Sequence, residues 1–223
     1  MRTILLTFLL FISMCITAQE IEENILENKT YIERMAYFKA NPLKKGQIIF
    51  LGNSLTQGGK WEVFFPAQNP ANRGIAGDNT LGMLYRLPEI IGTQPRKLFL
   101  LAGINDISLN RSNEKIMTGI RSIIYQVKAG SPSTKIYVQS LFPINNNRPV
   151  RYKRMLNKEI QIEELNKELH KFCAKEGITF INIYPAFLGS DKTMDTKYTT
   201  DGLHLNDSGY TVWVDRIRQY VEE

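Results

Sequence analysis

The sequence predicts an α/β fold in which a parallel β-sheet is covered by helices on both faces. Short apolar segments alternate with segments of helical periodicity from residue 47 onward, as in βαβ proteins. The apolar segments at 48–51 and 98–101 contain no polar residue, as is typical of strands buried on both faces. The chain has 223 residues, which suits one such domain with modest additions.

Residues 1–18 are predicted to be a secretory signal peptide. One basic residue, Arg2, precedes an apolar stretch over residues 4–16, and a polar segment starts after Ala18. We therefore expect cleavage near Ala18, export to the periplasm or the cell exterior, and no stable membrane span after cleavage. The alternative is an uncleaved membrane anchor, which is disfavoured because Ser13 interrupts the apolar stretch and acidic residues follow it.

Residues 19–46 are predicted to form a helical extension that packs on the main domain, residues 47–223. An amphipathic helix is expected over residues 21–38, because apolar residues recur there at spacings near three, four and seven. Its apolar face consists of Ile21, Ile25, Ile32, Met35 and Phe38. Asn41-Pro42 should end this helix.

Five parallel strands are expected in the main domain, at residues 47–51, 72–74, 97–101, 135–139 and 179–183. Ligands of an open parallel sheet bind beyond the carboxyl ends of its strands. Ser54, Gly77 and Asn105 each follow one of the first three strands by three or four residues. These three residues should therefore lie at the same edge of the sheet.

Three longer helices should cover the sheet. The first begins at Ser112 or Asn113, the second closes at Gly177, and the third is capped by Asp207 or Ser208. Their apolar faces are Ile116, Ile120, Ile123, Ile124 and Val127; Met155, Ile162, Leu165, Leu169 and Phe172; and Tyr210, Trp213, Val214, Ile217, Tyr220 and Val221. The polar residues 145–149 are expected to form a mobile surface loop.

Composition and motifs argue against several classes of protein. The formal net charge is +6, but the Lys and Arg residues are scattered, which gives little support for nucleic-acid binding. Cys173 is the only cysteine left after cleavage, so no internal disulfide is expected, and its place on an apolar helix face predicts a buried, inert thiol. The sequence has neither a dinucleotide-binding glycine motif nor a cluster of metal-ligand residues, so we expect no cofactor and no metal.

Three side chains from distant segments could form the nucleophilic part of an acyl-transfer site. A serine hydroxyl needs a base within hydrogen-bond reach and a third group that orients the base. Ser54, His204 and Asp201 can fill these roles, and Gly202 allows a tight turn between the last two. The only other histidine, His170, lies in a Lys- and Glu-rich helix and is expected at the surface.

The charge that develops on the substrate carbonyl oxygen needs fixed hydrogen-bond donors. The backbone N–H groups of Ser54 and Gly77 and the side-chain amide of Asn105 could supply them. Loss of one such donor is expected to lower turnover by about 10²- to 10³-fold.

Each of these segments also has a simpler structural explanation when it is considered alone. Asn53-Ser54 could cap a helix, and Asp78 could cap the helix after Gly77. Asn105 could cap its own turn, and Asp106 could cap the helix that follows. The ordered set of segments, rather than any one of them, favours catalysis.

The chain resembles the SGNH, or GDSL-type, serine hydrolases from residue 47 to residue 223. The segments that carry this resemblance are Gly52-Asn53-Ser54-Leu55, Gly77-Asp78, Gly103-Ile104-Asn105-Asp106 and Asp201-Gly202-Leu203-His204. The resemblance implies a three-layer α/β/α, flavodoxin-like fold with about five parallel strands. It also implies Ser54 as nucleophile with Asp201 and His204, and Gly77 and Asn105 in the oxyanion hole.

The residues around the catalytic set match the family's blocks at Gly52, Gly103 and Asp106, but Asn53 stands where the family's usual motif has Asp. The segment 72–80 and the ending 203–210 look closest to the platelet-activating-factor acetylhydrolase-like branch, which has secreted bacterial relatives that are carbohydrate O-acetylesterases. The sequence therefore predicts a secreted serine esterase for short-chain esters of a small molecule or glycan, including sialate-type substrates. The alternatives are a lipid esterase or lysophospholipase, and a non-catalytic glycan-binding module with the same fold.

Overall fold

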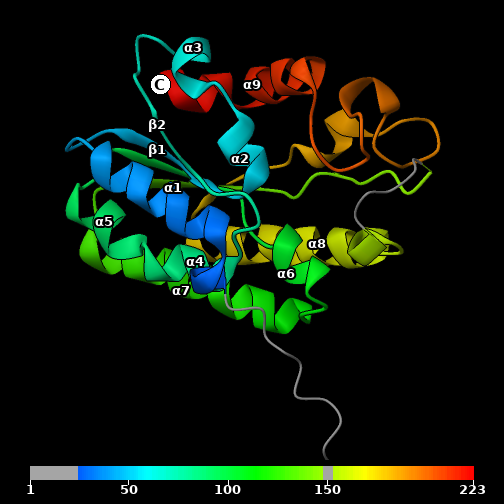
Figure 1. Cartoon of the computed structure of the whole chain (residues 1–223), viewed down its shortest axis with the longest axis horizontal. Coiled ribbons are helices and arrows are strands. Elements are labelled where there is room, and N and C mark those ends of the chain that lie inside the picture. The colour runs from blue at the N-terminus through cyan, green and yellow to red at the C-terminus, as the bar shows by residue number, and fades with distance from the viewer. Residues whose placement is uncertain (1–24, 148–152) are drawn as a thin grey trace, which may run out of the picture.

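The computed structural model describes residues 25–147 and 153–223, so the predicted signal peptide and the start of the predicted N-terminal helix lie outside the described residues. The described residues form a five-stranded, all-parallel sheet between two layers of helices (Figure 1). The strand order is β2-β1-β3-β4-β5. The strands are β1 (Ile48–Gly52), β2 (Ala71–Gly74), β3 (Lys97–Leu100), β4 (Lys135–Gln139) and β5 (Thr179–Ile181). The predicted α/β/α fold is confirmed.

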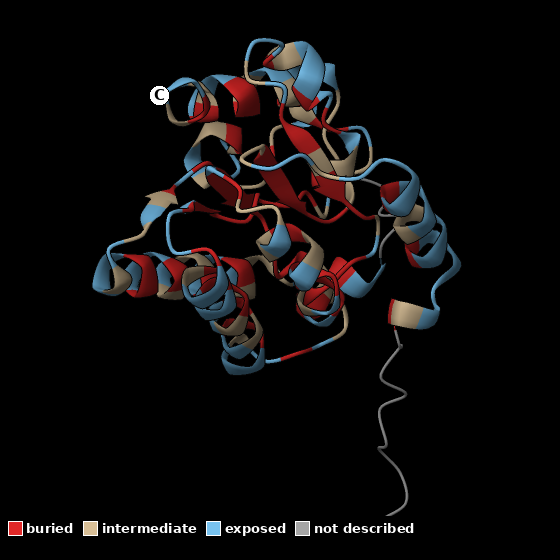
Figure 2. Cartoon of the chain, turned by 90° about the vertical axis from the view of Figure 1, so that its left-hand side faces the viewer, coloured by how far each residue is buried: buried red, intermediate tan, exposed pale blue. Residues whose placement is uncertain are grey.

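Helices cover both faces of this sheet, and the buried residues gather in the strands and on the helix sides that face them (Figure 2). One face carries α2 (Ser54–Gly58), α3 (Trp61–Phe64) and α9 (Asp207–Glu222). The other face carries α1 (Lys29–Ala40), α4 (Thr80–Tyr85), α5 (Leu87–Gly92), α6 (Ile104–Ser108), α7 (Asn113–Gly130) and α8 (Glu159–Glu176). Short 3₁₀ helices are η1 (Ile25–Glu27), η2 (Lys153–Met155), η3 (Tyr184–Phe187) and η4 (Thr196–Tyr198).

A row of stacked aromatic rings joins three strands to the α3 and α9 layer. The register places Phe50 of β1 beside Phe99 of β3, and Phe99 beside Tyr137 of β4. Their ring centroids lie 4.8 and 4.7 Å apart. Trp61 of α3 stacks on Phe50 at 4.1 Å, and Trp213 of α9 meets Trp61 edge-on at 4.9 Å. This row fixes α9, and with it the preceding loop, against the sheet.

Most predicted helix ends agree with the structure, and one does not. Ser112 caps α7, and α8 ends at Gly177, whose left-handed φ of 64° suits glycine. The cap of α9 is Asn206 rather than Asp207 or Ser208, because the Asn206 side-chain oxygen accepts a backbone N–H from the first turn.

The segment before α8 differs from the prediction in two ways. Met155 is buried, but it belongs to η2, and α8 begins only at Glu159. The predicted mobile loop begins with a buried residue, Asn145, whose amide donates to the carbonyl of Met194 at 2.6 Å. Residues 148 and 149 of that loop lie outside the described residues.

The N-terminal extension packs on the sheet through α1, which begins at Lys29, ends at Ala40 and is followed by the C-cap Asn41. Tyr31 and Phe38 are buried with Ile75, and the Tyr31 hydroxyl donates to the carbonyl of Gly82 at 2.8 Å. Ile32, expected on the apolar face, is 54% exposed. The expected face was wrong there because η1 and the cap Asn28 separate Ile25 from α1, so Ile25 and Ile32 do not lie on one continuous helix.

Candidate active site

Four loops meet at the carboxyl edge of the sheet. Ser54 begins α2 directly after β1, Gly77 lies in the loop after β2, and Asn105 lies in α6 after β3. Since β1 lies between β2 and β3, Ser54 occupies the middle of this edge. The loop before α9 returns to the same place and brings His204 to Ser54. The structure thus brings together the segments that the sequence separates.

Ser54 is presented by a sharp turn from strand to helix. Asn53 caps α2, because its side-chain oxygen accepts the N–H of Leu55 at 3.0 Å. The Ser54 hydroxyl is therefore not needed for capping and lies 3.0 Å from Nε2 of His204. Gly52 permits the turn, since a Cβ there would lie 2.9 Å from the carbonyl oxygen of Leu101.

Asp201 orients the imidazole of His204. Its Oδ2 lies 2.8 Å from His204 Nδ1, while its Oδ1 accepts the backbone N–H groups of Leu203 at 2.9 Å and His204 at 2.8 Å. Gly202 closes this turn with a φ of 85°. Burial alone would raise the pKa of Asp201, but the bonds from the His204 ring and the two N–H groups outweigh it and lower that pKa. The carboxylate consequently stays charged beside the ring.

Two candidate hydrogen-bond donors, Gly77 and Asn105, line the same cavity as Ser54. Gly77 has a φ of 80°, which requires glycine, and its N–H donates to no group among the described residues. The Asn105 amide donates one hydrogen to the carbonyl of Asp78 at 2.8 Å. A primary amide has a second hydrogen, which remains for a ligand. Gly103, with a φ of 121°, and not Asn105, is the cap of α6.

Each of these donors is followed in the chain by an aspartate of a buried ion pair. The sequence analysis did not predict these two ion pairs. Asp78, next to Gly77, lies 2.7 Å from Arg86, and Asp106, next to Asn105, lies 2.7 Å from Arg111. Burial raises the pKa of Asp78, and Arg86 opposes that shift. Neither aspartate has the capping role considered for it. The cap of α4 is the next residue, Asn79, and that of α7 is Ser112.

Asp106 also ties the two donor loops to each other. Its carboxylate accepts the hydroxyl of Thr80 at 2.7 Å and the backbone N–H of Thr80 at 3.1 Å. Thr80 begins α4, the helix that follows Gly77. Its bonds to Asp106 therefore connect the loop after β2 to the loop after β3. The only signal in the sequence was the presence of acidic residues directly after Gly77 and Asn105.

One cavity of about 640 Å³ is lined by Ser54, His204, Gly77 and Asn105, while Asp201 contacts His204 Nδ1 and does not line it. Its wall includes Ile25 and Asn28 from the N-terminal extension and Lys153 and Arg154 from η2. No local sequence pattern identified these four residues, because they reach the cavity only through the packing of η1 and η2. The cavity is lined by Ile25, Asn28, Ser54, Ala76, Gly77, Asn79, Asn105, Ser108, Leu109, Lys153, Arg154, Met155, Leu203 and His204.

Other candidate reactive groups lie away from this cavity. His170 is exposed and stacks on Phe180, as expected of a surface histidine. Cys173 is buried, and burial raises the pKa of its thiol to about 11. Within residues 25–147 and 153–223, no three His, Cys, Asp or Glu side chains gather to hold a metal ion. No helix in the same ranges combines the length and apolarity needed to cross a bilayer.

Comparison with known proteins places this arrangement in a family. The model of the GDSL-like Lipase/Acylhydrolase family matches residues 50–212. The platelet-activating factor acetylhydrolase IB subunit alpha1 of Rattus norvegicus is 29% identical over 175 residues, which cover 75% of this chain and 72% of that protein. A solved GDSL-like lipase from Bacteroides thetaiotaomicron has a TM-score of 0.75 and 25% identity, covering 86% of this chain and 97% of its own.

A solved acetyl xylan esterase has a similar fold, with a TM-score of 0.65, 17% identity, and coverage of 78% of this chain and 99% of its own. The family match includes all four segments that meet at the sheet edge. The resemblance seen in the sequence is confirmed, and the chain belongs to the GDSL-like lipase/acylhydrolase family of ester hydrolases.

Proposed function

We propose that this esterase cleaves short-chain esters, foremost acetyl esters of carbohydrates, through a covalent acyl-enzyme on Ser54. The observation that carries the proposal is the continuous chain of contacts from Ser54 Oγ to His204 Nε2 at 3.0 Å and from His204 Nδ1 to Asp201 Oδ2 at 2.8 Å. This chain opens into the cavity that also contains Gly77 and Asn105. It has the geometry that nucleophilic catalysis by serine requires.

The proposed reaction has two halves. Ser54 Oγ attacks the ester carbonyl while His204 Nε2 takes its proton, and the N–H groups of Ser54 and Gly77 and the Asn105 amide stabilise the oxyanion. The tetrahedral intermediate collapses, and His204 gives the proton to the leaving alcohol. Water, deprotonated by the same imidazole, then attacks the acyl-enzyme and releases the carboxylic acid and free Ser54.

An acetyl group is favoured as the acyl part because two similar proteins, the acetylhydrolase subunit and the acetyl xylan esterase, are named for acetyl esters. For the alcohol part, the cavity wall supports a carbohydrate. Lys153 and Arg154 are cationic, and Asn28 and Asn79 carry amides, so sugar hydroxyls and a sugar carboxylate would both find hydrogen-bond partners. Export, which is predicted from residues 1–18, would place the enzyme where polysaccharides occur.

A lipid alcohol is the second candidate. It is favoured by the acetylhydrolase relative and by the apolar side chains in the same wall, which are Ile25, Leu109, Met155 and Leu203. The glycan-binding alternative has less support, because Asn53, the residue that suggested it, caps α2 and lies outside the chain of contacts from Ser54 to Asp201.

A series of p-nitrophenyl esters from acetate to palmitate tests the acyl preference. We expect kcat/KM to be highest for acetate or propionate and to fall steadily with chain length. Acetate release from acetylated xylan, acetylated sialic acid and an acetylated lysophospholipid then tests the alcohol. Preference for palmitate, or release from the lipid alone, would contradict the carbohydrate proposal.

Replacement of Asn105 by alanine should lower kcat by about 10²- to 10³-fold with little change in KM, because the amide stabilises charge that exists only in the transition state. The measurement is steady-state hydrolysis of p-nitrophenyl acetate. Asn113→Ala is the matched control, since Asn113 donates to the carbonyl of Gln161 and does not line the cavity. If the two variants had equal activities, Asn105 would not be a donor of the oxyanion hole.

A further inference from the structure

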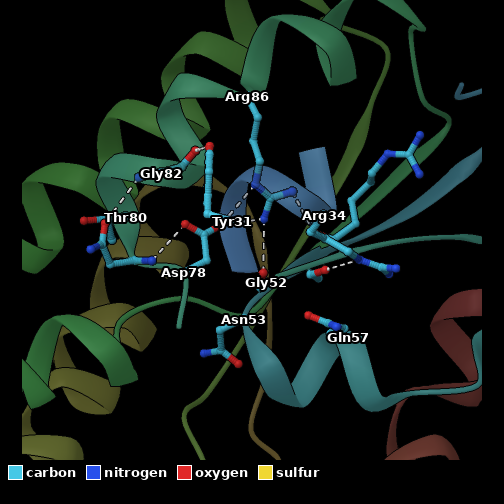
Figure 3. Close-up of polar contacts among 12 residues, drawn as sticks. Tyr31, Arg34, Gly52, Asn53, Gln57, Asp78, Thr80, Gly82 and Arg86 are labelled. Carbon is cyan, nitrogen blue, oxygen red and sulfur yellow. Dashed lines mark hydrogen bonds and ion pairs between the residues drawn. The ribbon is translucent and has the colours of Figure 1, made fainter. Parts of the chain in front are cut away.

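A buried guanidinium lies between the two backbone segments that carry the proposed oxyanion donors. Arg86 follows α4, and its side chain reaches between Asp78 and the end of β1 (Figure 3). Its Nη2 donates to the carbonyl of Gly52 at 3.1 Å and to Asp78 Oδ2 at 2.7 Å, and its Nε also donates to Asp78 Oδ2 at 3.0 Å. Its Nη1 donates to the carbonyl of Arg73 in β2 at 2.7 Å.

These bonds join the segments on which the donors sit. Gly52 is two residues before Ser54, and Asp78 directly follows Gly77. The carbonyl of Asp78 also accepts the amide of Asn105, so the orientation of the third donor depends on the same residue. We infer that Arg86 is a positioning residue that sets the distances between the three oxyanion donors, Ser54, Gly77 and Asn105. This inference rests on the proposed function.

The chemistry of the side chain supports a geometric role over a purely stabilising one. The Arg86 and Asp78 side chains are 1% and 0% exposed, and a buried ion pair of this kind contributes little net stability relative to well-packed apolar residues. A guanidinium, however, is planar and directs several N–H groups at fixed angles, so one side chain can hold three separate acceptors. A lysine ammonium is a point charge and cannot reproduce that fork.

Arg73 provides a matched control in the same region. It is also buried, lies over the ring of Phe38 at 4.3 Å, and pairs with Glu89 at 3.0 Å. Its side chain donates to the carbonyl of Asn41 at the end of α1 and to Glu89, and so contacts neither donor segment. Arg73→Lys should therefore perturb packing and charge without moving the donors.

The test compares Arg86→Lys with Arg73→Lys on p-nitrophenyl acetate, with thermal unfolding of both. We expect Arg86→Lys to lose about 100-fold in kcat, the size of effect that a displacement near 1 Å can cause. KM should change little, and the pH profile of kcat/KM should keep its shape, because Arg86 does not contact Ser54, His204 or Asp201. Arg73→Lys should retain wild-type kcat at a comparable loss of stability.

A double-mutant cycle separates positioning from general destabilisation. Because Arg86 acts through the donors, Arg86→Lys should cost less in the Asn105→Ala background than in the wild type. Asp78→Asn, which keeps the shape of the carboxyl group, serves if Arg86→Lys does not fold and should lower kcat in the same direction. Equal kcat losses in Arg86→Lys and Arg73→Lys, or fully multiplicative effects in the cycle, would overturn the inference. If the proposed function were wrong, Ser54→Ala would instead hydrolyse p-nitrophenyl acetate as fast as the wild type.

Discussion

Ser54→Ala is expected to lower kcat for p-nitrophenyl acetate by roughly 10⁴- to 10⁶-fold, the range that loss of a serine nucleophile produces in other serine hydrolases. The residual rate would come from the oxyanion donors and from substrate binding, which the substitution leaves in place. Stability should change little, because the hydroxyl does not cap α2 and, among the described residues, bonds only the His204 ring.

Ser122→Ala is the matched control for this variant. Ser122 lies in α7, is half-buried, and donates to the carbonyl of Thr118 within the helix. Labelling with a fluorophosphonate followed by peptide mass spectrometry should place the adduct on Ser54 in the wild type and in Ser122→Ala. An adduct on another residue, or a Ser54→Ala variant with activity near that of the wild type, would show that the nucleophile lies elsewhere.

Asp201→Asn should lower kcat by about 10⁴-fold, as expected when the group that fixes the imidazole tautomer becomes a neutral amide. An asparagine at this position can still accept the N–H groups of Leu203 and His204 through its side-chain oxygen, so the turn should persist. The loss should therefore appear in kcat, with the fold retained.

Asp195→Asn is the control, because Asp195 makes a similar turn by accepting the N–H of Lys197 but does not touch His204. The folded-state pKa of Asp201 lies below its ordinary value of 3.8. The stability it contributes is thus fully present above that value and is lost as the pH falls through the lowered pKa. Unfolding of wild type and Asp201→Asn at a series of pH values should differ most near neutrality. A difference that grows on acidification, or unchanged kcat, would contradict this role.

The architecture and the meeting of the candidate site segments were predictable because they follow from short-range patterns. Continuous apolar runs identified β1 and β3, and β4 was predicted with the observed bounds. In a parallel sheet, residues just after the strands must share one edge, which places Ser54, Gly77 and Asn105 near each other. Helix caps were predicted less well, because Asn79 and Asn206 have polar neighbours that could cap equally well by sequence alone.

The arginines that pair with Asp78 and Asp106 next to the site could not be predicted, since their roles depend on long-range packing. Arg86 and Arg111 look like ordinary charged residues near helix ends, and only the folded chain shows that both are buried against aspartates. The same holds for Ile25, whose contact with the cavity depends on how the N-terminal extension lies on α4. Sequence patterns locate elements, but they do not specify which element supplies each wall of a cavity.

The stacked aromatic row gives this protein an internal optical reporter. Both of its tryptophans, Trp61 and Trp213, are fully buried and touch one another. Their emission in the folded state should be blue-shifted and should move to longer wavelength when solvent reaches the indoles. Because the Trp61 indole N–H donates to the carbonyl of Thr56, two residues beyond Ser54, the same fluorescence should also register acylation of the enzyme if that step displaces α2.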